Sequence, residues 1–120
     1  MDDSATLKQF LTAAGYMVLA VTLDDGTPWA TPVKIQKWDG NTFEWDSKVD
    51  TVHSKAIAAR PHVALSIFST AESTGQYGFY AKATAELVHA DERGFGRYRA
   101  IVGKAWINDA SFRKREVTLG

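Results

Sequence analysis

The spacing of hydrophobic residues changes from a helical period to a strand period near residue 16. Leu7, Phe10, Leu11 and Ala14 recur every three or four residues, which predicts an amphipathic helix over 4–14 that stops at Gly15. Val, Leu and Met are then frequent over residues 16–23, as in a strand that is buried on both faces or packed in a barrel.

Two turn signals divide the next part of the chain. Asp24-Asp25-Gly26-Thr27 is typical of a hairpin turn, and Asp39-Gly40-Asn41 marks a second one. We expect a strand over 29–38 between the turns and another over 42–46. Pro32 cannot donate a ladder hydrogen bond, so it should lie at a sheet edge or a bulge.

The remaining residues predict two more helices and three more strands. Asp50 or Thr51 should cap a helix that runs to 59 and stops at Arg60-Pro61. After it we expect a strand over 62–68, a loop over 69–76, a strand over 77–88, a helix from Asp91 to 102 and a last strand within 112–119. Short links between strands favour an antiparallel sheet, and six strands with few helices favour closure into a barrel.

Composition narrows the possible functions. A chain of 120 residues fits one domain spanning 1–120. Its 14 basic and 14 acidic residues give no net charge, which argues against a nucleic-acid partner. The absence of cysteine excludes disulfides, zinc-thiolate sites and a cysteine nucleophile. With no apolar run near ~20 residues and an acidic start, we expect no membrane partner and a cytoplasmic protein.

The most informative candidate site is the start of the helix predicted after residue 50. His53, Ser54 and Lys55 lie in its first turn, where free amides and the positive end of the helix dipole favour phosphate groups. A lysine ammonium and a serine hydroxyl would complete such an anion site. The alternative from the same spacing is that Lys55 is a solvated surface residue and Ser54 a capping residue.

Other chemistries find less support. Asp50, His53 and Ser54 could form a hydrolase triad, but no Gly-x-Ser-x-Gly elbow accompanies them. The three histidines lack metal-ligand spacing, so we expect no metal site. Gly94 and Gly96 lie inside a predicted helix and so do not read as a dinucleotide-binding loop. The four tryptophans suit core or interface packing, and they would also suit contact with a planar ring.

Several segments, in order, resemble the pyridoxamine 5′-phosphate oxidase-like family of FMN-binding split barrels. They are DGTPWATPV at 25–33, WDGNTFEW at 38–45, HSKA at 53–56, ARPHVALSIF at 59–68 and YAKATAEL at 80–87. The resemblance covers residues 16–90 and implies a mainly β fold, a six-stranded antiparallel split barrel with a few short helices. It also implies a homodimer with FMN at the interface.

Carried over from the family, the cofactor-binding positions fall on five parts of the chain. Ser54 and Lys55, following His53, would hold the FMN phosphate, and Asp46 and Ser47 would face the phosphate or the ribityl chain. Trp45, next to them, is a further cofactor-binding candidate. The isoalloxazine edge would meet Thr31, Pro32, Val33 and Lys34, with Gln76 and Tyr77 approaching from a later strand and Trp106 reaching across the dimer. An acidic Asp46 beside a phosphate is unfavourable unless it points away or accepts from a donor.

The resemblance implies an FMN-dependent oxidoreductase that acts on an unidentified small molecule. The flavin would carry the hydride or electrons, and no side chain stands out as a general acid or base, so no catalytic residue is assigned. Because the longer C-terminal segment of true oxidases has no counterpart, we expect a substrate other than a B6 vitamer. The alternatives are a deazaflavin-dependent reductase, whose anionic tail would use Lys34, Lys37 and Lys48, and a non-enzymatic flavin or haem carrier.

Overall fold

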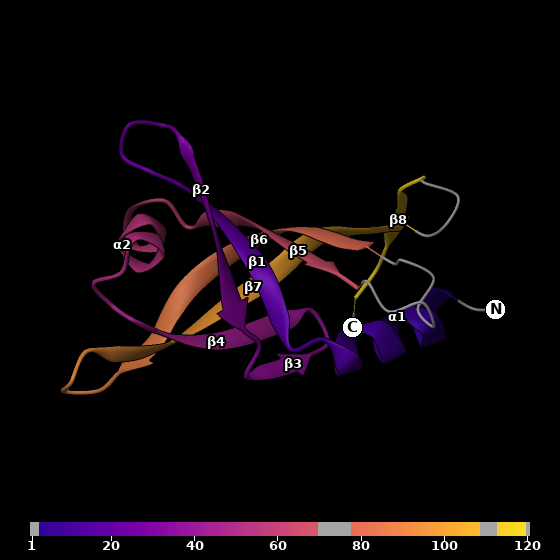
Figure 1. Cartoon of the computed structure of the whole chain (residues 1–120), viewed down its shortest axis with the longest axis horizontal. Coiled ribbons are helices and arrows are strands. Elements are labelled where there is room, and N and C mark those ends of the chain that lie inside the picture. Colours follow the sequence, from indigo (N-terminus) through magenta and orange to yellow (C-terminus); the bar gives the residue numbers. More distant parts are fainter. Residues whose placement is uncertain (1–2, 70–77, 109–112, 120) are drawn as a thin grey trace.

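Strands dominate the described part of the chain. The computed structural model describes residues 3–69, 78–108 and 113–119. Its elements are α1 (Asp3–Ala13), β1 (Tyr16–Thr22), β2 (Pro28–Lys34), β3 (Lys37–Asp39), β4 (Thr42–Lys48), α2 (Val52–Ala59), β5 (His62–Phe68), β6 (Gly78–Ala90), β7 (Phe95–Asn108) and β8 (Arg115–Val117) (Figure 1). The predicted mainly β class with short helices is confirmed.

All eight strands belong to one antiparallel sheet. Their order is β2-β1-β5-β6-β7-β4-β3, with β8 added to β7 beyond the end of β4. No pairing joins β2 to β3 among the described strands, so hydrogen bonding leaves the sheet open at this seam. The structure has two strands more than the six expected. One arises because the predicted strand over 29–38 divides into β2 and β3 at Ile35 and Gln36.

The second additional strand replaces a helix, because the helix predicted from Asp91 to 102 is wrong. Asp91 caps a hairpin turn: its Oδ1 accepts from the amides of Arg93 and Phe95 at 2.9 and 3.0 Å. Gly94 supplies the positive φ of 84° that this turn requires. The chain then enters β7, whose buried residues alternate strictly with exposed or half-buried ones from Phe95 to Val102.

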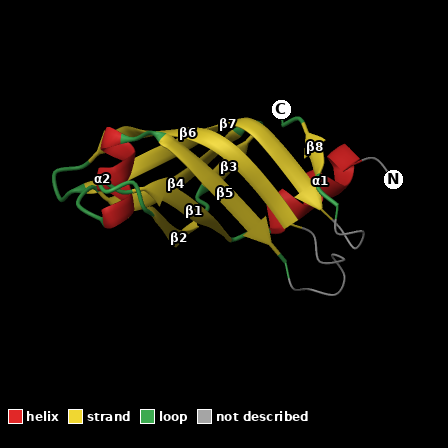
Figure 2. Ribbon diagram, turned by 90° about the horizontal axis from the view of Figure 1, so that it is seen from above, coloured by secondary structure: helices red, strands yellow, loops and turns green. Residues whose placement is uncertain are grey.

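The two helices lie at opposite ends of the curved sheet, as Figures 1 and 2 show. In α1, Leu7, Phe10 and Leu11 are buried at the predicted helical spacing. In α2, Ala56 and Ile57 are buried among the strands. Neither helix, among the residues described, is long and apolar enough to span a lipid bilayer.

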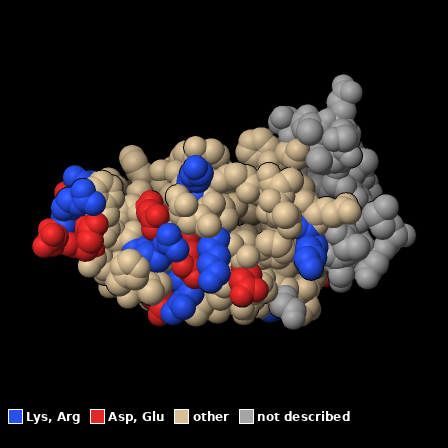
Figure 3. All heavy atoms as spheres, turned by 90° about the horizontal axis from the view of Figure 1, so that it is seen from below, with Lys and Arg blue, Asp and Glu red and all other residues tan. Residues whose placement is uncertain are grey.

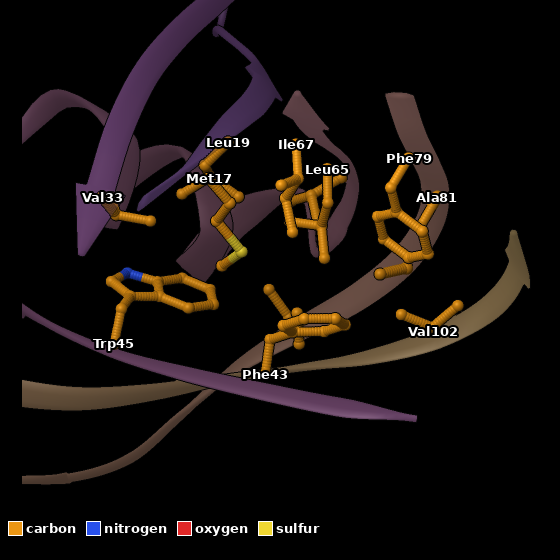
Figure 4. Close-up of a cluster of buried hydrophobic side chains, with 14 of the residues drawn as sticks. Met17, Leu19, Val33, Phe43, Trp45, Leu65, Ile67, Phe79, Ala81 and Val102 are labelled. Atoms are coloured by element: carbon orange, nitrogen blue, oxygen red, sulfur yellow. The ribbon is translucent and has the colours of Figure 1, made fainter. Parts of the chain in front are cut away.

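The core fills the space enclosed by the curved sheet. Figure 4 shows Phe43 and Trp45 of β4 facing aliphatic side chains of β1, β2 and β5. Both aromatic residues are fully buried, and Trp45 stacks on Tyr98 of β7 with ring centroids 5.8 Å apart. Pro32 lies on β2, the first strand of the order, which confirms the expected edge position.

The outer face of the sheet has two chemically different halves. Over β6, β7 and β4, cross-strand neighbours alternate in charge, as in the row Glu86, Arg99 and Glu44. Figure 3 shows basic and acidic side chains intermixed on the underside of the molecule. Over β2, β1 and β5, the rows hold small and apolar residues instead, among them Ala20 and Ala64.

Candidate functional site

The site begins where β4 ends and α2 starts. Thr51 is the N-cap of α2, with extended backbone (φ −71°, ψ 161°), and its Oγ1 accepts from the amide of Ser54 at 3.2 Å. Of the two caps that the sequence predicts, Asp50 and Thr51, Thr51 is confirmed. The remaining first-turn amides have no partner within the helix by geometry, so they are available to an acceptor outside it.

A chain of hydroxyl groups extends this cap. Thr51 Oγ1 lies 2.7 Å from Ser54 Oγ and 3.1 Å from the carbonyl oxygen of Lys48. Thr51 carries a single hydroxyl proton, so it can donate to only one of these two acceptors at a time. When Thr51 donates to Ser54, the Ser54 proton is free for another acceptor. Ser54 is nevertheless buried, with 2% of its surface exposed, so its main contacts are within the protein.

Ser47 and His53 form the second polar contact at this site. Ser47 Oγ lies 2.8 Å from His53 Nε2, which joins the end of β4 to the first turn of α2. Burial of the half-buried imidazole lowers the pKa of His53 below its ordinary value of 6.5. The neutral ring is therefore favoured at neutral pH, although a bound anion would oppose this shift.

Lys55 and Asp46 carry opposite charges at different places around the site. Lys55 is exposed in the first turn of α2. Asp46 alternates with Trp45 and Ser47 along β4, so its side chain leaves the sheet on the outer face. There it accepts from Arg97 Nε at 2.6 Å and from Arg97 Nη2 at 3.3 Å. Asp46 thus points to the outer face and accepts from a donor, and these are the two conditions under which an acidic residue is tolerated near a phosphate.

Trp45 and Val33 meet across the open seam of the sheet. Figure 4 shows the two side chains facing each other from β4 and β2, with the indole nitrogen on the side of Val33. Both residues are buried, and Val33 is paired with Met17 of β1 in the strand register. Trp45 Nε1 is buried and has no hydrogen-bond partner among the described residues.

The structure brings most of the predicted site residues together. The end of β4, which carries Trp45, Asp46 and Ser47, meets the start of α2, which carries His53, Ser54 and Lys55, and Ser47 contacts His53 directly. Strand β2, which carries Thr31, Pro32, Val33 and Lys34, contacts both elements. Trp106 is elsewhere: at about 3.3 Å per residue, it lies roughly 30 Å along β7 from Gly96, the partner of Ser47. Gln76 and Tyr77 lie outside the described residues.

Two contributors to this region were missed in the sequence. Thr51 was recognised only as a cap, although it also contacts Ser54 and Lys48 through its side chain. Arg97 was assigned to a helix and so could not be paired with Asp46. The alternation of Arg97 and Arg99 with Tyr98 and Ala100 is a strand signal that would have found it.

The donors at the start of α2 fit a phosphate group. First-turn amides and the Lys55 ammonium are positive or partly positive, and His53 can gain a proton. The neighbouring carboxylate of Asp46 is engaged with Arg97 on the outer face. The donor set therefore suits the phosphate end of a nucleotide-like cofactor.

Comparison with known proteins agrees with the fold. The structure resembles a haem-binding protein from Mycobacterium smegmatis, with a TM-score of 0.81 and 15% identity over 98% of this chain and 58% of that one. It also resembles a Clostridium acetobutylicum protein related to general stress protein 26 of B. subtilis, of the pyridoxinephosphate oxidase family. Here the TM-score is 0.81 and the identity 10%, over 98% of this chain and 96% of that one. An F420 reductase is similar as well, with a TM-score of 0.71 and 17% identity over 82% of this chain and 94% of that one.

These identities establish the fold alone, and this chain spans 58% of the length of the haem-binding protein. A search of curated proteins found no significant match. The family model described as pyridoxamine 5′-phosphate oxidase matches residues 4–118, which include every described strand. The chain therefore belongs to the pyridoxamine 5′-phosphate oxidase family.

Proposed function

We propose that this protein binds FMN and acts as an oxidoreductase on a small molecule. The observation that carries the proposal is the donor cluster at the start of α2, where Ser47, His53 and Lys55 surround the capped first turn. This cluster lies within the segment that the family model matches. A phosphate group and a planar ring are the two parts of FMN that the protein must hold.

The phosphate end is assigned to the first turn of α2. Backbone amides there would donate to phosphate oxygens, and Lys55 would add a charge-assisted contact. His53 would donate as well once protonated, and its bond to Ser47 fixes the orientation of the ring. Ser54 supports this arrangement from within, through its contacts with Thr51.

The ring end is assigned to β2 and the seam that it forms with β4. Residues 31–34 would line the isoalloxazine edge, chiefly through backbone groups, because β2 is an edge strand with one side of its ladder unpaired. Bound FMN would supply hydride or electron transfer. The residues of this chain would position the ring, exclude water on the side of Val33 and Trp45, and hold the phosphate.

We further infer that the protein acts as a homodimer with the cofactor at the interface. The outer face of β2, β1 and β5 carries small and apolar residues, including Val18, Ala20 and Ala64, and no element of the described chain covers it. Tyr16 and Phe68 are 64% and 68% exposed at one end of this face. A second copy would bury this surface, since contiguous exposed apolar patches mark interfaces.

The dimer is tested by measuring the molar mass of the protein as it elutes in size-exclusion chromatography. An Ala64→Arg substitution should convert the dimer into a monomer, because it places a long, positively charged side chain in the middle of the apolar face. Ala90→Arg, a change at another exposed alanine, at the far end of β6, should leave the dimer intact. A wild-type monomer, or an Ala64→Arg dimer, would refute this assignment.

The FMN site is tested by titrating apoprotein with FMN and following flavin fluorescence. Lys55→Ala should weaken binding by roughly 1–3 kcal/mol, or about 5- to 150-fold in Kd, through loss of a charge-assisted contact. Lys8→Ala removes an exposed lysine from α1, at the opposite end of the molecule, and should leave Kd unchanged. Equal Kd values for wild type and Lys55→Ala would contradict the phosphate assignment.

A further inference from the structure

Two lysines face each other on the outer face of the sheet. Lys82 of β6 and Lys104 of β7 are direct cross-strand partners, and both are exposed. Like charges in this relationship destabilise a sheet. Two rows away on the same face, beyond Thr84 and Ile101, the same two strands place Glu86 opposite Arg99, with a nitrogen–oxygen distance of 2.6 Å. The lysine pair thus departs from the alternation of charge that the rest of this half follows.

Within the described part of the chain, no acidic side chain forms an ion pair with either of these lysines. On the neighbouring strand β5, Ala64 is the partner of Lys82 and is uncharged, and the next outward residue is His62. Glu116 of β8, opposite Trp106, is the nearest acid by register and forms no ion pair with either lysine. An anion from solution would relieve the repulsion.

The backbone opens a groove between the lysines. The register of β6 and β7 shifts after Lys82, so that Gly103 is an extra residue in β7. A Cβ placed on Gly103 would have only the carbonyl oxygen of Lys82 within 4 Å, at 3.7 Å, so this position is open. The resulting groove has a volume of about 590 Å³ and is lined by His62, Lys82, Thr84, Ile101, Gly103 and Lys104 among others.

The groove also has apolar parts. Ala83 and Val102 lie beneath it, and Ile101 is 40% exposed on its wall. Cationic groups above an apolar floor suit a ligand that combines an anionic group with a hydrocarbon or aromatic body. Inorganic anions would satisfy the lysines but leave the apolar wall in water.

We propose that this groove binds a small organic anion, a phosphate ester or a carboxylate with an apolar body. Lys82 and Lys104 contact the anionic group from both sides, His62 lies at the entrance, and Ile101 packs against the body. His62 follows the C-terminal end of α2, whereas Lys55 lies in the first turn of that helix. The residues that line the groove include none of those assigned to FMN.

The proposal is tested by titrating ¹⁵N-labelled protein with phenyl phosphate, benzoate and inorganic phosphate while recording amide spectra. Phenyl phosphate or benzoate should shift the amides of Lys82, Gly103 and Lys104, and the better of the two identifies the anionic group. Inorganic phosphate should bind the groove at least about fivefold more weakly because it leaves Ile101 uncovered. Shifts confined to the first turn of α2, or equal affinity for inorganic phosphate, would overturn the proposal.

A single substitution separates the site from a general surface effect. Lys104→Glu converts the repulsive pair into an attractive one, so thermal unfolding should occur about 2–4 °C higher. The same variant should lose at least about tenfold in affinity for the organic anion. Lys8→Glu on α1 should neither raise the unfolding temperature by this amount nor weaken the binding of the organic anion. Undiminished binding by Lys104→Glu, or a lower unfolding temperature, would contradict the assignment.

Discussion

Arg97 on β7 holds the carboxylate of Asp46 on β4 through two hydrogen bonds, from Nε to Oδ1 at 2.6 Å and from Nη2 to Oδ2 at 3.3 Å. The two residues are direct partners in the strand register. Arg97 also donates from Nη1 to Glu44 at 3.0 Å, so one guanidinium bridges two acids on the same face. These bonds, first those to Asp46, raise the pKa of Arg97.

Removal of the Arg97 side chain should therefore lower the free energy of unfolding. Arg97→Ala leaves Glu44 and Asp46 two positions apart on one strand without their shared cation, and we expect a loss of about 1–2 kcal/mol in the free energy of unfolding. Arg93→Ala is the control, because the Arg93 side chain is 80% exposed and its contact with Asp91 spans 4.0 Å. Urea denaturation measures both; equal losses would show that the bridge contributes nothing.

The pH dependence of stability should report on His53. Burial lowers the pKa of His53 in the folded state below 6.5, so the unfolded chain binds more protons as pH falls through this window. The stability contributed by the neutral ring is present above pH 6.5 and is lost as pH falls toward the lowered pKa. Between about pH 7.5 and about pH 5.5, the free energy of unfolding should decrease.

Substitution isolates that contribution. In His53→Gln the decrease over the same pH range should be smaller, because the group that protonates on unfolding is gone. His89→Gln, a change at an exposed histidine of β6, is the control for the removal of a histidine side chain. A His53→Gln profile parallel to that of the wild type would show that His53 is not the responsible group.

Trp45 offers a test of the core beside the seam. Trp45→Ala should cost about 3–5 kcal/mol, as is typical of a buried aromatic residue. Trp45→Phe should cost less, about 1–2 kcal/mol. A phenyl ring can keep the stack with Tyr98, and it removes an indole N–H that has no partner among the described residues. Denaturation curves that put the two variants within error of each other would contradict this account of Trp45.

Two glycines of β7 differ in the space available for an added Cβ atom. At Gly96 an added Cβ would approach Leu87 Cδ1 to 2.8 Å and Tyr98 Cε2 to 3.0 Å, whereas Gly103 has only a contact at 3.7 Å. Leu87 is exposed and can move, but Tyr98 is buried against Trp45. Gly96→Ala should therefore destabilise by about 1–2 kcal/mol, and Gly103→Ala should change stability by less than about 0.5 kcal/mol. A reversed order, measured by thermal unfolding, would show the packing around Gly96 to be looser than described.

Local signals predicted the elements that local interactions determine. The turns at Gly26 and Gly40 need a positive φ, and both glycines have it. The helix that starts at Thr51 follows from its cap and ends before Pro61, as expected. These features depend on a few neighbouring residues and are therefore visible in the sequence.

Features that depend on pairing between distant residues were harder to predict. Asp91 is as good a cap for a hairpin turn as for a helix, and the long pairing of β7 with β6 and β4 decided between them. The partner of Asp46 follows from that same pairing. The candidate phosphate site was found from residues 53–55, but the contact of His53 with Ser47 required the end of β4 to meet α2.

The absorbance spectrum of the purified protein, before and after incubation with FMN and removal of the excess, tests the central claim most directly. We predict bands near ~450 and ~375 nm that remain with the protein. A band near ~420 nm would indicate a deazaflavin and a sharp Soret band would indicate haem, and either one without retained FMN would contradict the proposed cofactor. A colourless protein that retains no added FMN would contradict flavin binding altogether.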